Sequence, residues 1–427
     1  MSVFAILLII VNLILLYQIC RSQKVHIMLK IIWCVSYVGW SALPLVLTMS
    51  PSFTNMVTIP FDFYLTYASL NQIALCLMNI YAFYLINTRR LPKIFVKNDF
   101  QDSVKFNKVL FWISSILLIF VIFRLMTTSL GYQERNDVEY MSSNSSLGFL
   151  SLLEDLAVFT ILAQIIWKRD VLGKAKLLSG ELLLSCYVLM QIYNGRRIYM
   201  FFFVIVLLYF SYKTSKKKYL IYACCGGLLA LWLLPIIGEI RQEDKIHVDK
   251  IVEAGENDDN DILNQVILKT NSVQYSCYLL LHDGIGQQGP KLYTSTLYAL
   301  VPRIIYPDKP IPGSVDGTLN GIPARLNANY HRDSHSDVEN NGVTSSLEAL
   351  WALGWFMFIL QIFISGYVIY LFNGILYGGK PLFIYFMFSL IGFPVCVMDV
   401  SLVKLLLSIQ RYIIIYIFFK LIFRTNK

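Results

Sequence analysis

Three arginines lie next to long apolar segments, and a fourth lies with a lysine in a stiff loop held near the bilayer by its apolar flanks. Arg196 and Arg197 are adjacent in a short loop between two such segments, and Arg241 follows the next segment. Arg303 and Lys309 lie in a stretch with three prolines in nine residues, which makes a stiff loop. Arginine binds phosphate through a planar fork of donors and stays charged when partly desolvated. The pattern indicates an anion-binding site.

Two further side chains are suited to proton transfer. His335 lies in a polar stretch, where an imidazole can act as a general base near neutral pH. Glu348 begins an apolar segment, and a helix N-terminus there would keep the carboxylate ionised and aimed outward. We expect His335 to take up a proton, and Glu348 to position a substrate or accept the proton itself.

Each of these residues also has a purely structural interpretation. The adjacent arginines can extend along a membrane surface. Arg241 can form an ion pair with Glu239 or Asp244, and Lys309 can be a solvated turn residue. His335 can be solvated, and Glu348, as a carboxylate in a first helical turn, can simply stabilise the helix N-terminus. Both interpretations stay open at this point.

The composition identifies the elements that must hold these side chains. The chain has 427 residues, of which 56% are hydrophobic and 15% charged. Because a soluble domain is about a quarter charged, this chain needs lipid to cover its surface. That excludes a soluble enzyme, a disordered protein, a nucleic-acid binder and a small disulfide-stapled domain. The net charge of +9 is better explained by basic cytoplasmic loops than by nucleic acid.

We predict an all-α polytopic membrane protein with about eleven transmembrane helices. A spanning helix needs roughly 20 apolar residues. Residues 1–237 hold the first eight helices, 238–345 form one large outer loop, and 346–427 hold the last three. The segments are 2–20, 27–48, 63–86, 109–127, 147–167, 177–194, 198–212, 219–237, 346–372, 382–400 and 402–423.

The loop charges predict the orientation. Of the 36 basic residues, 21 fall in loops or ends on one side, including 89–108 and the C-terminus. The positive-inside rule makes this the cytoplasmic side, so the N-terminus and 238–345 lie outside. Within the large loop, apolar residues between 263 and 281 recur at helical spacing and predict an amphipathic helix on the membrane or the bundle.

Two residue types inside the spans lead to further expectations. Arg411 lies well inside the last segment and should face a partner or a cavity. Seven of the eight cysteines lie in or next to spans, and we expect them to be small core residues.

Three local motifs together with this topology suggest a family. They are the arginine pair in 194–197, the Pro-Arg and Pro-x-Lys-Pro strings in 302–310, and a Gly-x-Thr-Ser-x-x-Glu string in 342–348. The chain resembles the bacterial O-antigen or capsule polymerases (Wzy), integral-membrane enzymes that polymerise oligosaccharide repeat units. The resemblance covers the topology of the whole chain. The odd span count with an external N-terminus departs from many relatives, which have both ends inside.

The resemblance implies a membrane glycosyltransferase with a GT-C-like architecture, related to the O-antigen ligases. A growing glycan on undecaprenyl diphosphate would move onto the end sugar of a lipid-linked repeat unit, at the periplasmic face of the inner membrane. The residues that would bind the diphosphate are Arg196, Arg197, Arg241, Arg303 and Lys309. His335 and Glu348 would be catalytic. We expect no cofactor and no metal, and whether a chain-length regulator docks on the protein stays open.

Three other functions remain as alternatives. An O-antigen ligase would share the fold and the donor. A flippase for lipid-linked oligosaccharides, or another transporter, would be expected to show internal repeats and short loops. A structural membrane protein would not need arginines on the outer face. The 108-residue outer loop and the absence of a visible repeat favour the polymerase.

Overall fold

A computed structural model of the protein describes residues 2–49, 59–90, 100–127, 147–193, 272–287, 344–391 and 402–423, with single positions at 209, 221, 224, 225 and 293. Within these residues the chain is helical and no β-strand occurs. The predicted spans that they cover fall on helices, whereas 198–212, 219–237 and the part 392–400 of the span 382–400 lie outside them apart from the single positions. The all-α prediction is confirmed for this part of the chain.

Four described helices are long and apolar enough to cross a membrane, and they correspond to α1, α5, α7 and α21. The elements are α1 (Ser2–Arg21), α2 (Ile27–Tyr37), η1 (Val38–Ala42), α3 (Leu43–Thr48), α5 (Phe61–Thr88), η2 (Phe100–Asp102), α7 (Val104–Thr127), α10 (Leu147–Trp167), α11 (Arg169–Leu172), α12 (Lys174–Tyr193), α17 (Ser272–Asp283), α20 (Ser345–Leu353), α21 (Trp355–Gly378), α22 (Pro381–Ile391) and α23 (Leu402–Ile422).

The outward faces of these helices carry large apolar side chains. Phe4 on α1, Phe123 on α7 and Phe356 on α21 are 48%, 62% and 77% exposed. Water would make such extensive apolar faces aggregate, whereas lipid tails solvate them. The described helices are therefore those of a membrane protein.

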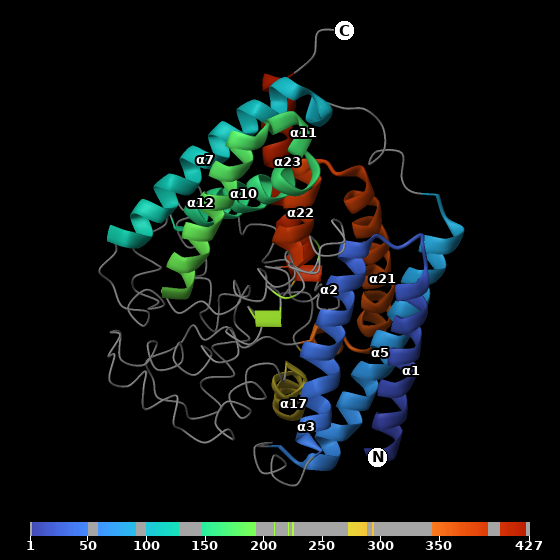
Figure 1. The fold of residues 1–427 in the computed structure, drawn as a ribbon. Helices are drawn as coiled ribbons and strands as arrows, with labels where there is room; N and C mark the ends of the chain where they lie inside the picture. Colours follow the sequence, from blue (N-terminus) through green and yellow to red (C-terminus); the bar gives the residue numbers. More distant parts are fainter. Residues whose placement is uncertain are drawn as a thin grey trace.

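The helices form two groups (Figure 1). In one group α5 packs against α1 and α21, with α2, η1, α3, α17 and α20 around them. In the other, α10 packs against α7, α12 and α22, and α23 packs against α22. The contact between α21 and α22, which follow one another in the chain, joins the two groups.

Two predicted spans are more complex than single helices. The span 27–48 consists of α2, the π-helix η1 and α3, because Pro44 has no N–H to donate to the carbonyl four residues earlier. The predicted span 346–372 divides at Gly354 into α20 and α21, and α21 continues to Gly378. Gly354 has a φ of +76°, a conformation that other residues rarely adopt.

A buried polar network holds the first group together inside the membrane region. Asn12 Nδ2 donates to Gln72 Oε1 at 3.2 Å, and Tyr37 OH donates to the same oxygen at 3.0 Å. Asn79 Nδ2 donates to Asn12 Oδ1 at 3.3 Å, and Trp33 Nε1 donates to Asn79 Oδ1 at 2.9 Å. Buried amides are unfavourable unless hydrogen-bonded, so this network fixes how α1, α2 and α5 pack.

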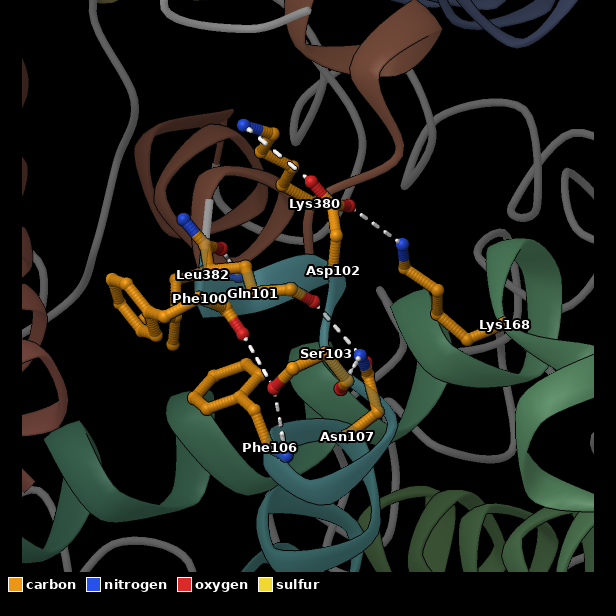
Figure 2. A network of polar contacts seen from close by, with 9 residues as sticks. All are labelled: Phe100, Gln101, Asp102, Ser103, Phe106, Asn107, Lys168, Lys380 and Leu382. Atoms are coloured by element: carbon orange, nitrogen blue, oxygen red, sulfur yellow. Dashed lines mark hydrogen bonds and ion pairs between the residues drawn. The ribbon is translucent and has the colours of Figure 1, made fainter. Parts of the chain in front are cut away.

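A second polar network lies within the second group, at the start of α22 (Figure 2). Asp102 pairs with Lys168 at 3.1 Å and with Lys380 at 3.9 Å, and the side chain of Lys380 is only 2% exposed. Gln101 Oε1 accepts the N–H of Leu382 at 3.0 Å and so caps the first turn of α22. The network joins the starts of α7 and α22 to the end of α10.

Similar bonds join the turns at the same end of the first group. His26 N–H donates to Asn373 Oδ1 at 2.8 Å, and Lys24 Nζ donates to the carbonyl of Asn87 at 2.7 Å. These residues and those of the Asp102 network all lie in or beside turns predicted to be cytoplasmic. Figure 1 shows the ends of α1, α5 and α21 and the starts of α7 and α22 toward one side of the molecule. That arrangement agrees with the predicted direction of each helix.

Candidate functional site

The structure describes one of the predicted site residues, Glu348. The other six lie outside the described residues: Arg196, Arg197, Arg241, Arg303, Lys309 and His335. Their roles stay predictions. The site is therefore built from Glu348 and from the elements that position it.

Glu348 lies in the first turn of the short helix α20, just before the break that begins α21. It is 8% exposed. The helix α20 packs against α5, α17 and α21, so Glu348 lies against the bundle. A helix N-terminus still favours a negative charge at this position.

The helix α17 holds the start of α20. The cap residue Thr344 makes no side-chain cap of its own, and its N–H donates instead to Ser276 Oγ at 2.9 Å. At the other end of α20, Trp351 Nε1 donates to Asp283 Oδ2 at 3.0 Å. Backbone groups at helix ends need such external partners. The two contacts fix α20 along the length of α17.

The second part of the segment predicted as an amphipathic helix is helical, as α17. Cys277 and Leu280 are buried at 0% and 4%, whereas Leu281 is 41% exposed. The residues 263–271 lie outside the described part of the chain. Because α17 packs against α5 and α20, it lies on the bundle, which is one of the two predicted positions.

The helix α5 makes a further contact with α20. Ser346 Oγ donates to Asn71 Oδ1 at 2.8 Å, and Asn71 is 2% exposed. The next residue, Gln72, belongs to the buried network with Asn12 and Tyr37. The position of α20 therefore depends on the same stretch of α5 that orders the membrane helices.

A tyrosine that sequence analysis missed lies near Glu348. Tyr293 is 9% exposed. Burial raises the pKa of its phenol, and the negative charge of Glu348 raises it further. Tyr293 therefore stays protonated at neutral pH and can act as a hydrogen-bond donor. The residues around Tyr293 form no recognisable motif, so the sequence alone does not relate Tyr293 to Glu348.

This arrangement suits an interaction with a hydroxyl group. A carboxylate with little access to water has strong electrostatic interactions, because the local dielectric is low. A carboxylate accepts hydrogen bonds and a protonated phenol donates one, so the two side chains combine an acceptor and a donor. The carboxylate can accept a proton from a hydroxyl or orient that hydroxyl. Within the described residues there is no group of three His, Cys, Asp or Glu side chains that could hold a metal.

The charged residues inside the second helix group have partners of their own. Arg411 on α23 lies 3.8 Å from a carboxylate oxygen of Asp155 on α10, so the expectation of a partner for Arg411 is confirmed. Glu154 accepts hydrogen bonds from Tyr187 OH and, at 2.7 Å, from Gln191 Nε2. Ion pairs and hydrogen bonds of this kind join helices within a membrane. They tie α10 to α12 and α23.

Comparisons with protein-family models, with curated proteins and with solved structures return no match.

Proposed function

We propose that the protein is a membrane glycosyltransferase that polymerises lipid-linked oligosaccharide repeat units. Under this proposal it has eleven spans in a GT-C-like arrangement in the bacterial inner membrane, with its active site facing the periplasm. The observation that carries the proposal is the buried Glu348, whose negative charge raises the pKa of the Tyr293 phenol, on a short helix at the predicted outer end of α21. A carboxylate so placed can act on a hydroxyl group at the membrane surface.

The reaction is a displacement at the first sugar of the growing chain. The acceptor hydroxyl attacks the anomeric carbon, and the bond from that carbon to the phosphate oxygen breaks. The lipid diphosphate leaves with the bonding electrons, and a base takes the hydroxyl proton. Because the phosphate–sugar bond supplies the energy, the reaction needs no nucleotide sugar.

In this proposal the charged residues of the sequence motifs act on the leaving group. The developing negative charge of the diphosphate needs fixed positive charge at the level of the lipid headgroups. Arg196, Arg197, Arg241 and Arg303 supply it, with Lys309 beside them. His335 takes the proton of the acceptor hydroxyl, and Glu348 positions that hydroxyl.

The contacts at the predicted cytoplasmic end argue against a flippase. A transporter must open to both sides of the membrane in turn. Here Lys380 is 2% exposed and paired with Asp102, and Asp102 also binds Lys168. Opening that end would separate a buried charge from its partner, which is strongly unfavourable. A protein that stays closed at its cytoplasmic end suits an enzyme whose substrates are already outside.

The test is the glycan pattern of cells that lack the protein. A polymerase mutant displays single repeat units on its surface, whereas a ligase or flippase mutant displays no surface glycan. The purified protein mixed with lipid-linked repeat units should then give a ladder of products. Surface ladders of normal length in the deletion strain would refute the proposal.

A further inference from the structure

Two cysteines on neighbouring helices are in direct contact. The sulfur atoms of Cys20, near the end of α1, and Cys34, in α2, lie 3.4 Å apart. Both are free thiols and both are partly exposed. The expectation that the cysteines near spans are core residues is therefore wrong for this pair, and Cys186, Cys224 and Cys225 are exposed as well.

The surroundings of Cys20 favour thiol reactivity. Lys30 Nζ donates to the carbonyl of Cys20 at 2.8 Å, which holds an ammonium group beside that residue. Arg21 follows Cys20 directly in the chain. Positive charge stabilises a thiolate, and partial exposure lets a reagent reach it. Cys20 also lies beside the turn between α1 and α2, which is predicted to face the cytoplasm.

We propose that Cys20 and Cys34 form a dithiol modification site that reacts with small-molecule disulfides and with thiol-bridging reagents such as trivalent arsenicals. One thiolate attacks the disulfide R–S–S–R, forms a mixed disulfide and releases one R–SH. The second thiolate then attacks the protein sulfur of that bond and releases the second R–SH. The two protein thiols are oxidised by two electrons, and R–S–S–R is reduced to two R–SH.

The geometry requires little movement. A disulfide has a sulfur–sulfur distance of about 2.05 Å, so the two sulfurs must approach by roughly 1.3 Å. Side-chain rotation at the two cysteines can provide most of this shift. The bond would link the end of α1 covalently to α2. The two helices are already connected through Gln72, which accepts hydrogen bonds from Asn12 and Tyr37. The consequence is a hairpin that oxidation locks at its cytoplasmic end.

The experiment uses the reduced full-length protein in detergent with oxidised glutathione as the probe. Trypsin leaves Cys20 in the peptide 1–21 but leaves Cys34 and Cys76 together in 31–89. A Cys76→Ser parent therefore makes the linked peptide unambiguous in mass spectrometry. We expect the Cys20–Cys34 link to form at least about tenfold faster than any other, because thiols in contact react intramolecularly.

Two single variants and a second reagent make the result decisive. Cys20→Ser and Cys34→Ser should each abolish the link and leave the remaining partner as a mixed disulfide. Phenylarsine oxide, which must bridge two thiols, should protect both cysteines of the parent from N-ethylmaleimide and protect neither single variant. Persistent mixed disulfides in the parent, without a link and without arsenical protection, would overturn the proposal. Neither readout depends on glycan synthesis.

Discussion

Glu348 is the residue on which the chemistry depends most directly. It is 8% exposed and lies near a phenol that stays protonated, so its negative charge has few compensating water molecules. Glu348→Gln keeps the shape and removes the charge. We expect the polymerisation rate to fall about 100-fold or more, in the range of a lost acid–base or orienting group. The measurement is product formation by purified protein from lipid-linked repeat units.

The matched control for this substitution is Glu181→Gln on α12. Glu181 is exposed, and the same change there should leave the rate within a factor of about two, as for most surface substitutions. Equal rates in Glu348→Gln and the wild-type protein would show that the buried carboxylate is not needed.

Arg196 and Arg303 test the diphosphate site. A lost charge-assisted contact to a transition state costs about 2–4 kcal/mol, or roughly 30- to 1000-fold in rate. Arg196→Ala and Arg303→Ala should each abolish surface polymer while the protein still inserts into the membrane. Lysine should rescue poorly, because a point charge does not reproduce the two-donor fork of arginine. Near-normal glycan ladders from Arg303→Lys would mean that charge alone matters there.

The third residue prediction concerns the base. If His335 takes the proton, His335→Ala should lose activity, and the wild-type rate should fall as pH drops below about 6.5, where an imidazole protonates. The protonated form has no lone pair to accept the hydroxyl proton. A pH profile of the rate, with pH-matched thermal unfolding to exclude loss of the fold, checks this. A rate independent of pH between about 5.5 and 8 would assign the proton to another group.

At the scale of elements, the break between α20 and α21 decides where Glu348 lies. Gly354 has a φ of +76°, which an alanine adopts only with strain. We therefore expect Gly354→Ala to lower the free energy of unfolding by about 1–3 kcal/mol and to reduce activity, because α20 shifts. Thermal unfolding in detergent measures the first effect.

Gly39 provides the matched control for that change. A Cβ at Gly39 would meet no atom within 4 Å, and its φ is not positive. Gly39→Ala should be neutral or slightly stabilising, since alanine restricts the unfolded chain more than glycine does. If both alanine variants unfold at the temperature of the wild-type protein, the break does not depend on glycine.

For the whole molecule, the distribution of charge sets the orientation in the membrane. On a cysteine-free background, Lys291→Cys should react with a membrane-impermeant maleimide added to intact cells, and Lys97→Cys should react only after the cells are opened. Basic loops stay on the cytoplasmic side because moving them across the bilayer is unfavourable. The opposite labelling pattern would reverse the predicted topology and remove the basis of the proposed function.

Local sequence determined the helices and their expected directions. Continuous apolar segments such as 2–20 and 63–86 form α1 and α5. An apolar segment in lipid must satisfy its backbone hydrogen bonds within one helix. Glu348 could be singled out from its place before an apolar segment. None of these inferences needed to know which helices touch.

Tertiary structure decided the partners. The sequence could not show that Asp155 would face Arg411, that Tyr293 would lie near Glu348, or that Cys20 would touch Cys34. Within a membrane, apolar helices can pack against one another in many ways at similar free energy. The few buried polar contacts select one packing, and they form only when residues far apart in the chain meet. Composition and periodicity do not show which distant residues will be in contact.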